Sequence, residues 1–258
     1  MTQHERLIFL IQALLAEREE YADTAIPSDY GEQKRFLRAL MNVRPPQPIT
    51  PEFLQIQDEY LQTEIASKGI TELESLHEVR KDIYLWKGDI TTLRVDAIVN
   101  AANSGMTGCY YPCHGCIDNA IHSFAGVQLR LECAEMMKRQ GHDEPTGSAK
   151  ITKAYNLPCD YVIHTVGPIV GYQPTLRDRE MLISCYRSCM ELARQNHLQS
   201  IAFCCISTGE FHYPNREAAE IAVQTVQNYK GQTACPAKVV FNVFKDMDEQ
   251  IYQSIFSS

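Results

Sequence analysis

The sequence predicts an α/β layered fold, in which helices cover both faces of a central sheet, because strand-like and helical segments alternate from about residue 80. The strand-like runs are rich in β-branched and aromatic residues: DIYLW, DAIVN, YVIHTV, SIAFCCIS and KVVFNVF. The helical stretches lie near 117–140, 177–196, 214–229 and 247–256. This alternation is typical of layered α/β proteins. Ligands of such sheets bind where strands end, so the strand exits are the places to search for function.

The first 75 residues are expected to form helices instead. Apolar residues recur at helical spacing between Leu7 and Leu15, and a second amphipathic stretch covers 31–42. After the proline-rich segment RPPQPITP, Thr50 and Pro51 supply the N-cap and first turn of a third helix, which ends at Gly69. We therefore expect a helical N-terminal extension, residues 1–75, packed on a main domain of residues 76–258.

Composition limits the function classes. The chain has 258 residues, of which 45% are hydrophobic and 22% charged, as in globular proteins rather than disordered ones. A net charge of −8 without a long basic run argues against a nucleic-acid partner or an anionic membrane. The N-terminus does not resemble a signal peptide, and no apolar run approaches membrane-spanning length. We therefore expect a cytoplasmic protein, in which ten cysteines are reduced and serve either as core residues or as metal ligands.

The densest cluster of reactive side chains follows the second predicted strand. Cys109, Cys113, His114 and Cys116 fall within eight residues, and thiolate and imidazole are preferred zinc ligands. Ligation by all four would give a closed structural site, whereas three ligands would leave one position open. The short Cys-His-Gly-Cys segment makes ligation by all four awkward, which favours three protein ligands. The alternative is a cysteine-rich loop without metal.

Two further strand exits carry ligand-binding residue types. In Lys87-Gly88-Asp89-Ile90-Thr91, a glycine before a carboxylate brings backbone N–H groups and an acceptor to a ligand, although a turn with an Asp N-cap has the same pattern. In Val99-Asn100-Ala101-Ala102-Asn103, two asparagines flank small residues. A buried Asn needs hydrogen-bond partners, so this exit suits either a hydroxyl-rich ligand or a turn that closes the strand.

The last two exits suit a nucleotide-like ligand. Ser207, Thr208 and Gly209 precede a helix, as in sites where hydroxyls and N–H groups hold a phosphate. The segment has no P-loop lysine, which favours binding of a diphosphate over its cleavage; an N-capped helix start is the alternative. Phe244 follows the last strand and could stack on a base, although such a residue alone is more often part of a core.

Together these motifs resemble the macrodomain family, in order and spacing over about residues 70–258. The matching segments are Lys87-Gly88-Asp89-Ile90-Thr91, Val99-Asn100-Ala101-Ala102-Asn103, Cys116-Ile117-Asp118-Asn119-Ala120-Ile121-His122, Ile206-Ser207-Thr208-Gly209, and Phe244 with Asp248 and Tyr252. The resemblance implies a three-layer α/β/α fold with a mixed central sheet, and it is closest to the MacroD-type hydrolases. Where these carry a glycine-rich catalytic loop, this chain has Gly108–Cys116, which is similar to the zinc-containing macrodomains of microbes with their helical N-terminal extension.

The resemblance also implies how ADP-ribose would lie across the strand exits. Asp89 and the Ile90 N–H would receive the adenine end, and Phe244 would flank the base. The diphosphate would be wrapped by the segment after the fourth strand-like run: Ser207, Thr208, Gly209, Glu210 and Phe211.

The catalytic assignments come from the same resemblance. Asn103 would fix the distal ribose, and Asp118 would assist the attacking water. Zinc would be the cofactor, held by Cys109, His114 and Cys116, while Cys113 lies off the family's ligand pattern. An ion with an open site can act as a Lewis acid or lower the pKa of bound water, and a positioned carboxylate can orient or deprotonate that water.

The resemblance implies a zinc-dependent, glycosidase-type hydrolase that removes mono-ADP-ribose from protein side chains. Its expected partners are ADP-ribose, a mono-ADP-ribosylated protein such as a lipoyl-carrier protein, and the sirtuin-type ADP-ribosyltransferase whose modification it reverses. The alternative is a non-catalytic reader of ADP-ribose with a structural zinc. A nucleobase deaminase would also need His-x-Glu upstream of Pro112-Cys113-His114-Gly115-Cys116, and no such pair stands at a suitable distance.

Overall fold

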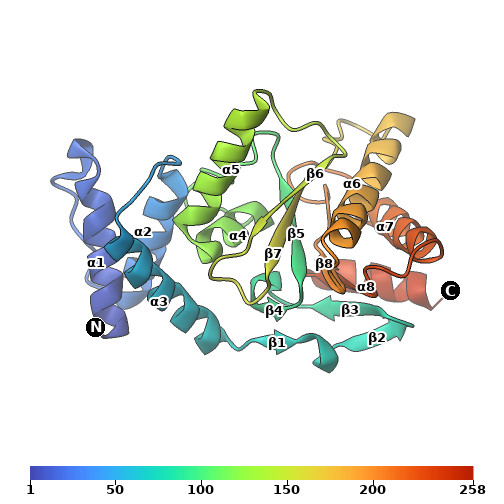
Figure 1. Cartoon of the computed structure of the whole chain (residues 1–258), viewed down its shortest axis with the longest axis horizontal. Helices are drawn as coiled ribbons and strands as arrows, with labels where there is room; N and C mark the ends of the chain where they lie inside the picture. Colours follow the sequence, from blue (N-terminus) through green and yellow to red (C-terminus); the bar gives the residue numbers. More distant parts are fainter. Residues whose placement is uncertain (258) are drawn as a thin grey trace.

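A seven-stranded mixed sheet forms the centre of the protein, whose computed structural model describes residues 1–257 (Figure 1). Its five inner strands are parallel, and the two edge strands run antiparallel to their neighbours. In spatial order the strands are β2 (His77–Arg80), β3 (Ile83–Lys87), β9 (Lys238–Val243), β8 (Ser200–Phe203), β5 (Ala97–Ala102), β7 (Tyr161–Val166) and β6 (Ala149–Lys153). Two short strands, β1 (Thr71–Glu72) and β4 (Leu93–Arg94), pair separately.

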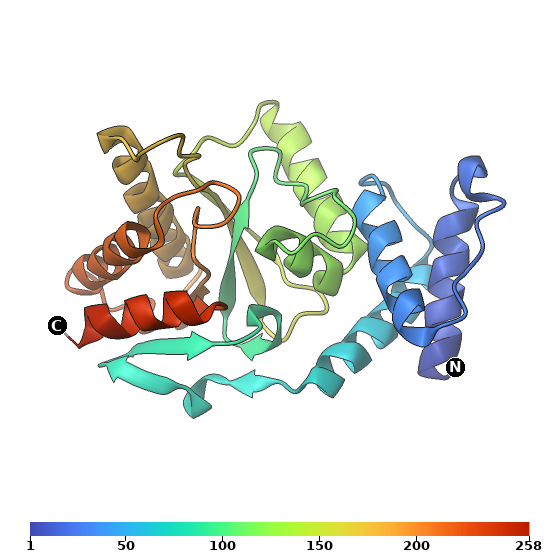
Figure 2. The ribbon, with the colours of Figure 1, turned by 180° about the vertical axis from the view of Figure 1, so that it is seen from behind.

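Helices cover both faces of this sheet, which confirms the predicted three-layer α/β/α architecture (Figures 1 and 2). One face carries α4 (Ile117–Ala125) and α5 (Val127–Gln140), and the other carries α6 (Leu176–Gln195), α7 (Asn215–Lys230) and α8 (Asp246–Phe256). Four of the inner strands, β5, β7, β8 and β9, are almost wholly buried because both their faces are covered, which is why they appear as nearly continuous apolar runs in the sequence.

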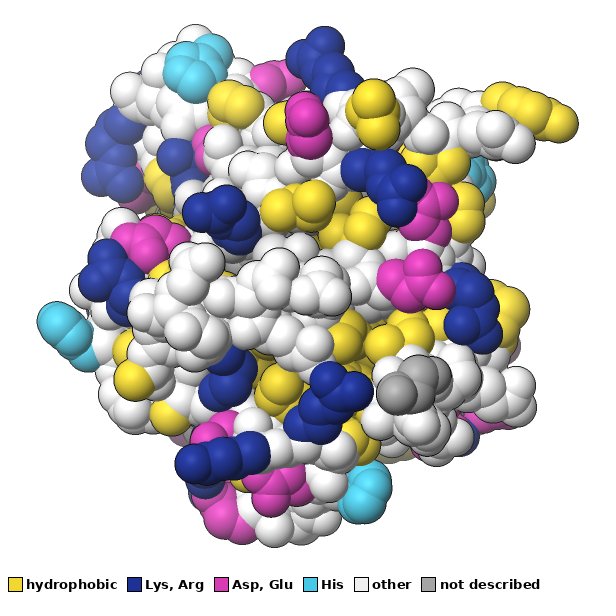
Figure 3. Space-filling view, turned by 90° about the vertical axis from the view of Figure 1, so that its right-hand side faces the viewer, with side chains coloured by type: hydrophobic (Ala, Val, Ile, Leu, Met, Phe, Trp, Pro, Cys, Tyr) yellow, Lys and Arg dark blue, Asp and Glu magenta, His cyan; other side chains and the backbone are white. Residues whose placement is uncertain are grey.

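The surface formed by α6, α7 and α8 carries positive and negative side chains side by side, rather than one extended basic area (Figure 3). No helix within residues 1–257 combines the length and apolar character that a membrane span requires.

Three details differ from the sequence-based expectations. The helix predicted over 117–140 is broken at Gly126, whose φ of 100° is incompatible with a right-handed helix. The strand predicted over SIAFCCIS ends at Phe203, and the following residues form a loop. Strand β6 was not among the strand-like runs of the sequence, because it is an edge strand whose residues are mostly only partly buried and therefore lack a strong apolar pattern.

The N-terminal helices are α1 (Gln3–Ala16), α2 (Tyr30–Val43) and α3 (Pro51–Lys68), as predicted. Each is capped by a side chain, from Thr2, Asp29 and Thr50 respectively. They bury a hydrophobic cluster that Val127 of α5 joins, and α2 and α3 contact α4 of the main domain (Figure 2). Short 3₁₀ turns occur at Glu19–Tyr21, Leu73–Ser75 and Ile90–Thr92.

Candidate functional site

The strand exits with candidate residues lie along one edge of the sheet. Strands β3, β9, β8 and β5 are consecutive neighbours and parallel, so their carboxyl ends meet at the same edge. The segments that follow them contain the predicted site residues: Asp89 and Ile90, Phe244, Ser207 to Phe211, and Asn103. The fold therefore arranges these candidates in a row, in the order expected for one elongated ligand.

Asp118 lies near the end of this row, buried in the first turn of α4 with 5% of its surface exposed. Its Oδ1 accepts a hydrogen bond from Asn100 Nδ2 at 2.8 Å, and its Oδ2 lies 3.4 Å from Asn103 Nδ2. Asn103 Nδ2 also donates to the Gly108 carbonyl at 3.2 Å. The structure thus brings the two predicted catalytic residues together, beside a third polar residue, Asn100.

The environment of Asp118 favours a carboxyl group that titrates near neutral pH. Burial raises its pKa to about 6, although the hydrogen bond from Asn100 and the positive charge of Arg130 oppose the shift. His122 stands one turn along α4, with Nε2 3.5 Å from Asp118 Oδ1. Burial holds the pKa of His122 well below its usual value, so its imidazole is neutral and does not form an ion pair with the carboxylate.

A histidine on an apolar helix face is expected to be a hydrogen-bonded packing residue, and His122 departs from that expectation. Neither of its buried ring nitrogens has a hydrogen-bond partner among residues 1–257. The loop that follows Asn103 passes directly over its ring, and a Cβ at Gly108 would lie 2.8 Å from two ring carbons. Gly108 also has a φ of 83°, so both space and backbone conformation require glycine there.

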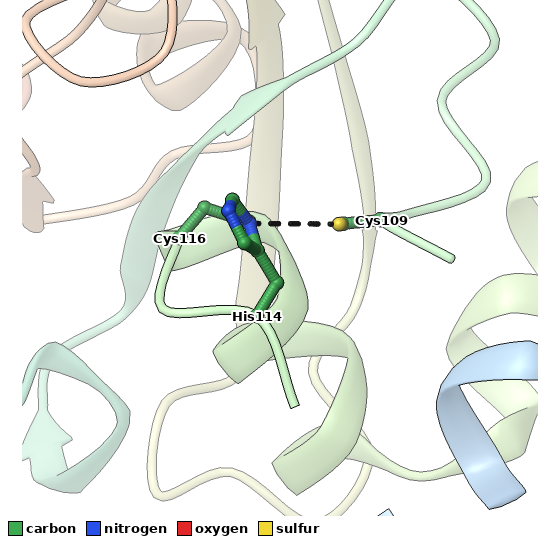
Figure 4. Close-up of side chains that lie close together, drawn as sticks. All are labelled: Cys109, His114 and Cys116. Atoms are coloured by element: carbon green, nitrogen blue, oxygen red, sulfur yellow. Dashed lines mark hydrogen bonds between the residues drawn. The ribbon is translucent and has the colours of Figure 1, made fainter. Parts of the chain in front are cut away.

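The metal loop, which we define as residues 108–116, gathers three donor atoms. The ligand atoms of Cys109, His114 and Cys116 all lie within 4.8 Å of one another (Figure 4). Cys109 Sγ is 3.8 Å from His114 Nδ1. Tetrahedral zinc, with bonds of about 2.0–2.3 Å, separates its ligand atoms by roughly 3.5–3.8 Å, so this spacing suits the ion. Burial raises the pKa of the Cys116 thiol to about 12, so a thiolate there needs a nearby positive charge.

The fourth candidate donor points elsewhere. Cys113 adopts a φ of 52°, and its Sγ donates to the Arg35 carbonyl on α2 at 3.3 Å. The seven cysteines outside the metal loop are free thiols, and five of them are buried in the core. Their burial fits the expectation that some of the ten cysteines are core residues.

The segment after β8, residues 206–213, makes a tight loop that faces the metal loop. Ser207 has a φ of 64°, and its buried Oγ finds no hydrogen-bond partner in the described part of the chain. The Tyr213 N–H donates to the Ser207 carbonyl at 2.9 Å, and the Val170 N–H donates to the Phe211 carbonyl at 2.8 Å. A buried hydroxyl without a partner is costly, and a ligand oxygen would satisfy it.

Glu210 extends from this loop toward the metal loop. Its Oε1 lies 3.6 Å from His114 Nε2, the ring nitrogen opposite the one that faces Cys109. Metal-binding histidines commonly direct their second ring nitrogen at a carboxylate, which fixes the ring orientation. Sequence reasoning placed Glu210 only with the diphosphate and missed this contact.

The other end of the row is formed by β3 and β9. The Gly88 N–H donates to the Val243 carbonyl at 3.1 Å, which brings Asp89 and Phe244 to neighbouring positions. Asp89 caps the turn after β3 by accepting from the Thr91 N–H at 3.0 Å, as the simpler alternative predicted. Phe244 is 78% exposed, so the alternative that it belongs to the core is wrong, and its ring is accessible to a ligand.

Comparison with known proteins decides the family. A family model described as Macro domain matches residues 99–222. The Protein-ADP-ribose hydrolase of Treponema medium is 59% identical over 261 residues and spans 100% of both chains. A protein of the same name from Staphylococcus aureus (strain MRSA252) is 48% identical over 254 residues, covering 98% of this chain and 95% of its own length. This chain belongs to the Macro domain family.

Solved structures of other macrodomains share the fold. The Trypanosoma brucei macrodomain in complex with ADP-ribose superposes on this macrodomain with a TM-score of 0.66 and 30% identity, over 84% of this chain and 94% of the other. The family resemblance predicted from the strand-exit motifs is therefore confirmed.

Proposed function

We propose that this macrodomain is a hydrolase that removes mono-ADP-ribose from modified protein side chains. The observation that carries the proposal is the buried carboxylate of Asp118, set between the amides of Asn100 and Asn103 at the sheet edge. A binding module needs no buried carboxylate with a pKa near 6 at this place, whereas bond hydrolysis needs a group that activates water. Two relatives of nearly the same length are named Protein-ADP-ribose hydrolase, which supports the assignment.

In this proposal the residues at the reacting end divide the work between positioning and proton transfer. The Asn103 amide holds the distal ribose by hydrogen bonds and so supplies orientation. Asp118, ionised above a pH of about 6, accepts a proton from the attacking water, which typically contributes 10²–10⁴-fold to the rate. Asn100 fixes the Asp118 carboxylate through its 2.8 Å hydrogen bond.

We further propose that Cys109, His114 and Cys116 hold a zinc ion. The donor set and the spacing of the three atoms suit zinc. When bound, such an ion with an open position supplies Lewis-acid assistance or a water of lowered pKa. Glu210 then orients the His114 ring from the neighbouring loop.

In this proposal the segments after β8, β9 and β3 bind the diphosphate and the adenine of ADP-ribose. The Ser207 hydroxyl and the N–H groups of Thr208 to Phe211 hold the diphosphate, which carries the acceptor oxygens that the unpartnered Ser207 lacks. Phe244 covers the adenine, and Asp89 with Ile90 receives its edge.

We propose a mono-ADP-ribosylated protein as substrate, with a sirtuin-type ADP-ribosyltransferase supplying the modification and a lipoyl-carrier protein as one candidate target. The support is the similarity of the metal loop and of the helical extension to the zinc-containing macrodomains of microbes.

The test combines metal analysis with an assay for released ADP-ribose. Purified protein is incubated with a mono-ADP-ribosylated protein, and wild type is compared with Asp118→Asn. We expect stoichiometric zinc in both proteins and release of free ADP-ribose by wild type alone. A zinc-replete wild type that binds ADP-ribose but releases none would instead identify a reader. Full turnover after complete removal of zinc would overturn the catalytic role of the metal.

A further inference from the structure

The metal loop is held in place by side chains from the N-terminal extension. Its nine residues include no helix or strand, so its backbone groups need partners elsewhere. On α2, Asn42 Oδ1 accepts a hydrogen bond from the Cys113 N–H at 2.9 Å, and Arg38 Nη2 donates to the His114 carbonyl at 3.1 Å. Asn42 is 1% exposed, so this contact is shielded from water. The backbone of two consecutive loop residues, Cys113 and the donor residue His114, is thus held by one helix of the N-terminal extension.

A second connection passes through Asn119, which is completely buried on α4. Arg38 donates to Asn119 Oδ1 twice, from Nε at 3.1 Å and from Nη2 at 2.7 Å. Because both guanidinium bonds reach the oxygen, the amide nitrogen faces the metal loop and donates to the Tyr111 carbonyl at 3.0 Å. The backbone N–H of Asn119 also donates to Cys116 Sγ at 3.4 Å. Arg38 therefore orients a residue that contacts the metal loop at two places.

A third connection is the buried guanidinium of Arg130 on α5. Its Nη1 donates to the carbonyls of Met41, Asn42 and Arg44 at 3.2, 2.6 and 2.7 Å. These carbonyls end α2, where no intrahelical donor is available and the helix dipole is negative. The Nη2 of the same side chain donates to the Cys109 carbonyl at 3.3 Å. Arg130 therefore connects the C-terminal end of α2 directly to Cys109, the first of the three candidate metal ligands.

We propose that α2 positions the metal loop, so that the helical extension is a working part of the metal site and not only a cover for the main domain. The proposal rests on the proposed function, because it assigns the positioned donors to zinc. Each of the three connections ends on or beside a donor residue: Cys109, His114 or Cys116. Groups that orient metal ligands in this way typically change metal affinity by 10- to 100-fold when removed. Asn42, Arg38 and Arg130 are positioning residues in this scheme, since none of them supplies a ligand atom.

The test compares variants of α2 that differ in whether they touch the metal loop. Asn42→Ala and Arg38→Ala each remove contacts with the loop or with Asn119. Leu40→Ala is the matched control, because Leu40 is buried in the extension's own hydrophobic cluster and contributes no side-chain hydrogen bond to the loop. Two quantities are measured well below the melting temperature of each variant: the rate at which zinc passes to a colorimetric chelator, and amide hydrogen exchange of the metal loop in metal-free protein.

We expect Asn42→Ala and Arg38→Ala to release zinc about 10- to 100-fold faster than wild type and to exchange the loop amides faster, whereas Leu40→Ala lowers the melting temperature but leaves both rates unchanged. Equal rates in the Asn42, Arg38 and Leu40 variants would overturn the positioning role, since loss of stability alone would then explain every effect. If wild type holds no zinc, the metal part of the proposed function is wrong, and the exchange rates in metal-free protein still decide whether α2 fixes the loop.

Discussion

Replacing Gly167 by alanine should weaken ADP-ribose binding, because this glycine follows β7 directly against the loop that carries Ser207. An added Cβ would stand 2.9 Å from Ile206 Cγ2 and in still closer contact with Ser207 Oγ, so the side chains of Ser207 and Ile206 must shift. Overpacking of this kind costs about 1–3 kcal/mol. If the displaced Ser207 hydroxyl holds the diphosphate, and ligand binding requires it to return to its original position, this cost lowers the affinity and the dissociation constant should rise about 5- to 140-fold.

Calorimetric titration with ADP-ribose measures this effect. Gly171→Ala is the matched control in the same connection, because a Cβ there would meet nothing within 4 Å. Its affinity should equal that of wild type. In the Gly167→Ala background, Ser207→Gly removes the hydroxyl that clashes and suits the φ of 64° at that position, so melting temperature should recover in part. Wild-type affinity in Gly167→Ala would refute the placement of the diphosphate against this loop.

The remaining predictions concern other parts of the row and the core beneath it. Asp118→Asn should reduce the rate of ADP-ribose release about 10²–10⁴-fold while ADP-ribose still binds, as assayed by chromatography of the released nucleotide. Phe244→Ala should weaken ADP-ribose binding by about 1–3 kcal/mol if the exposed ring stacks on adenine, and binding of ribose 5-phosphate should not respond. Burial lowers the pKa of His164 to about 3 from 6.5, so stability is fully present above pH 6.5 and falls as pH drops toward 3. At pH 5 the loss due to His164 is about 2 kcal/mol, and His164→Gln should remove that share of the pH dependence from urea unfolding curves measured between pH 7 and 5, while the share due to buried His122 stays.

The parts of the fold that could be predicted from the sequence are those with a strong local pattern. β7 was predicted at its observed bounds because a strand covered on both faces is a continuous apolar run. β6 was missed because an edge strand with partly buried residues has no such run. The break at Gly126 was missed because the apolar spacing of α4 continues into α5 across the glycine, although Gly126 itself was the available signal.

The candidate site divides in the same way. The residues that follow strands could be listed from sequence, since parallel strands end at one edge of a sheet. Contacts between segments far apart in the chain could not. The pairs Arg38–Asn119 and Asn42–Cys113 are separated by 81 and 71 residues, and neither residue of α2 belongs to a recognisable motif. An Arg and an Asn near the end of an amphipathic helix are ordinary surface residues until the packing of that helix is known.

The hydrogen bonds around Asp118 also suggest which of its oxygens acts. Oδ1 accepts the short hydrogen bond from Asn100, whereas Oδ2 has only the 3.4 Å contact with Asn103 Nδ2. The same Asn103 amide group also donates to the Gly108 carbonyl. The neighbouring imidazole of His122 is neutral and holds neither oxygen by a hydrogen bond. In the proposed reaction Oδ2 is therefore the oxygen that receives the proton of the attacking water. Burial raises the pKa of this carboxyl to about 6, so it is ionised at neutral pH yet basic enough to accept a proton. The hydrogen bond from Asn100 favours the ionised form and so limits the rise in pKa.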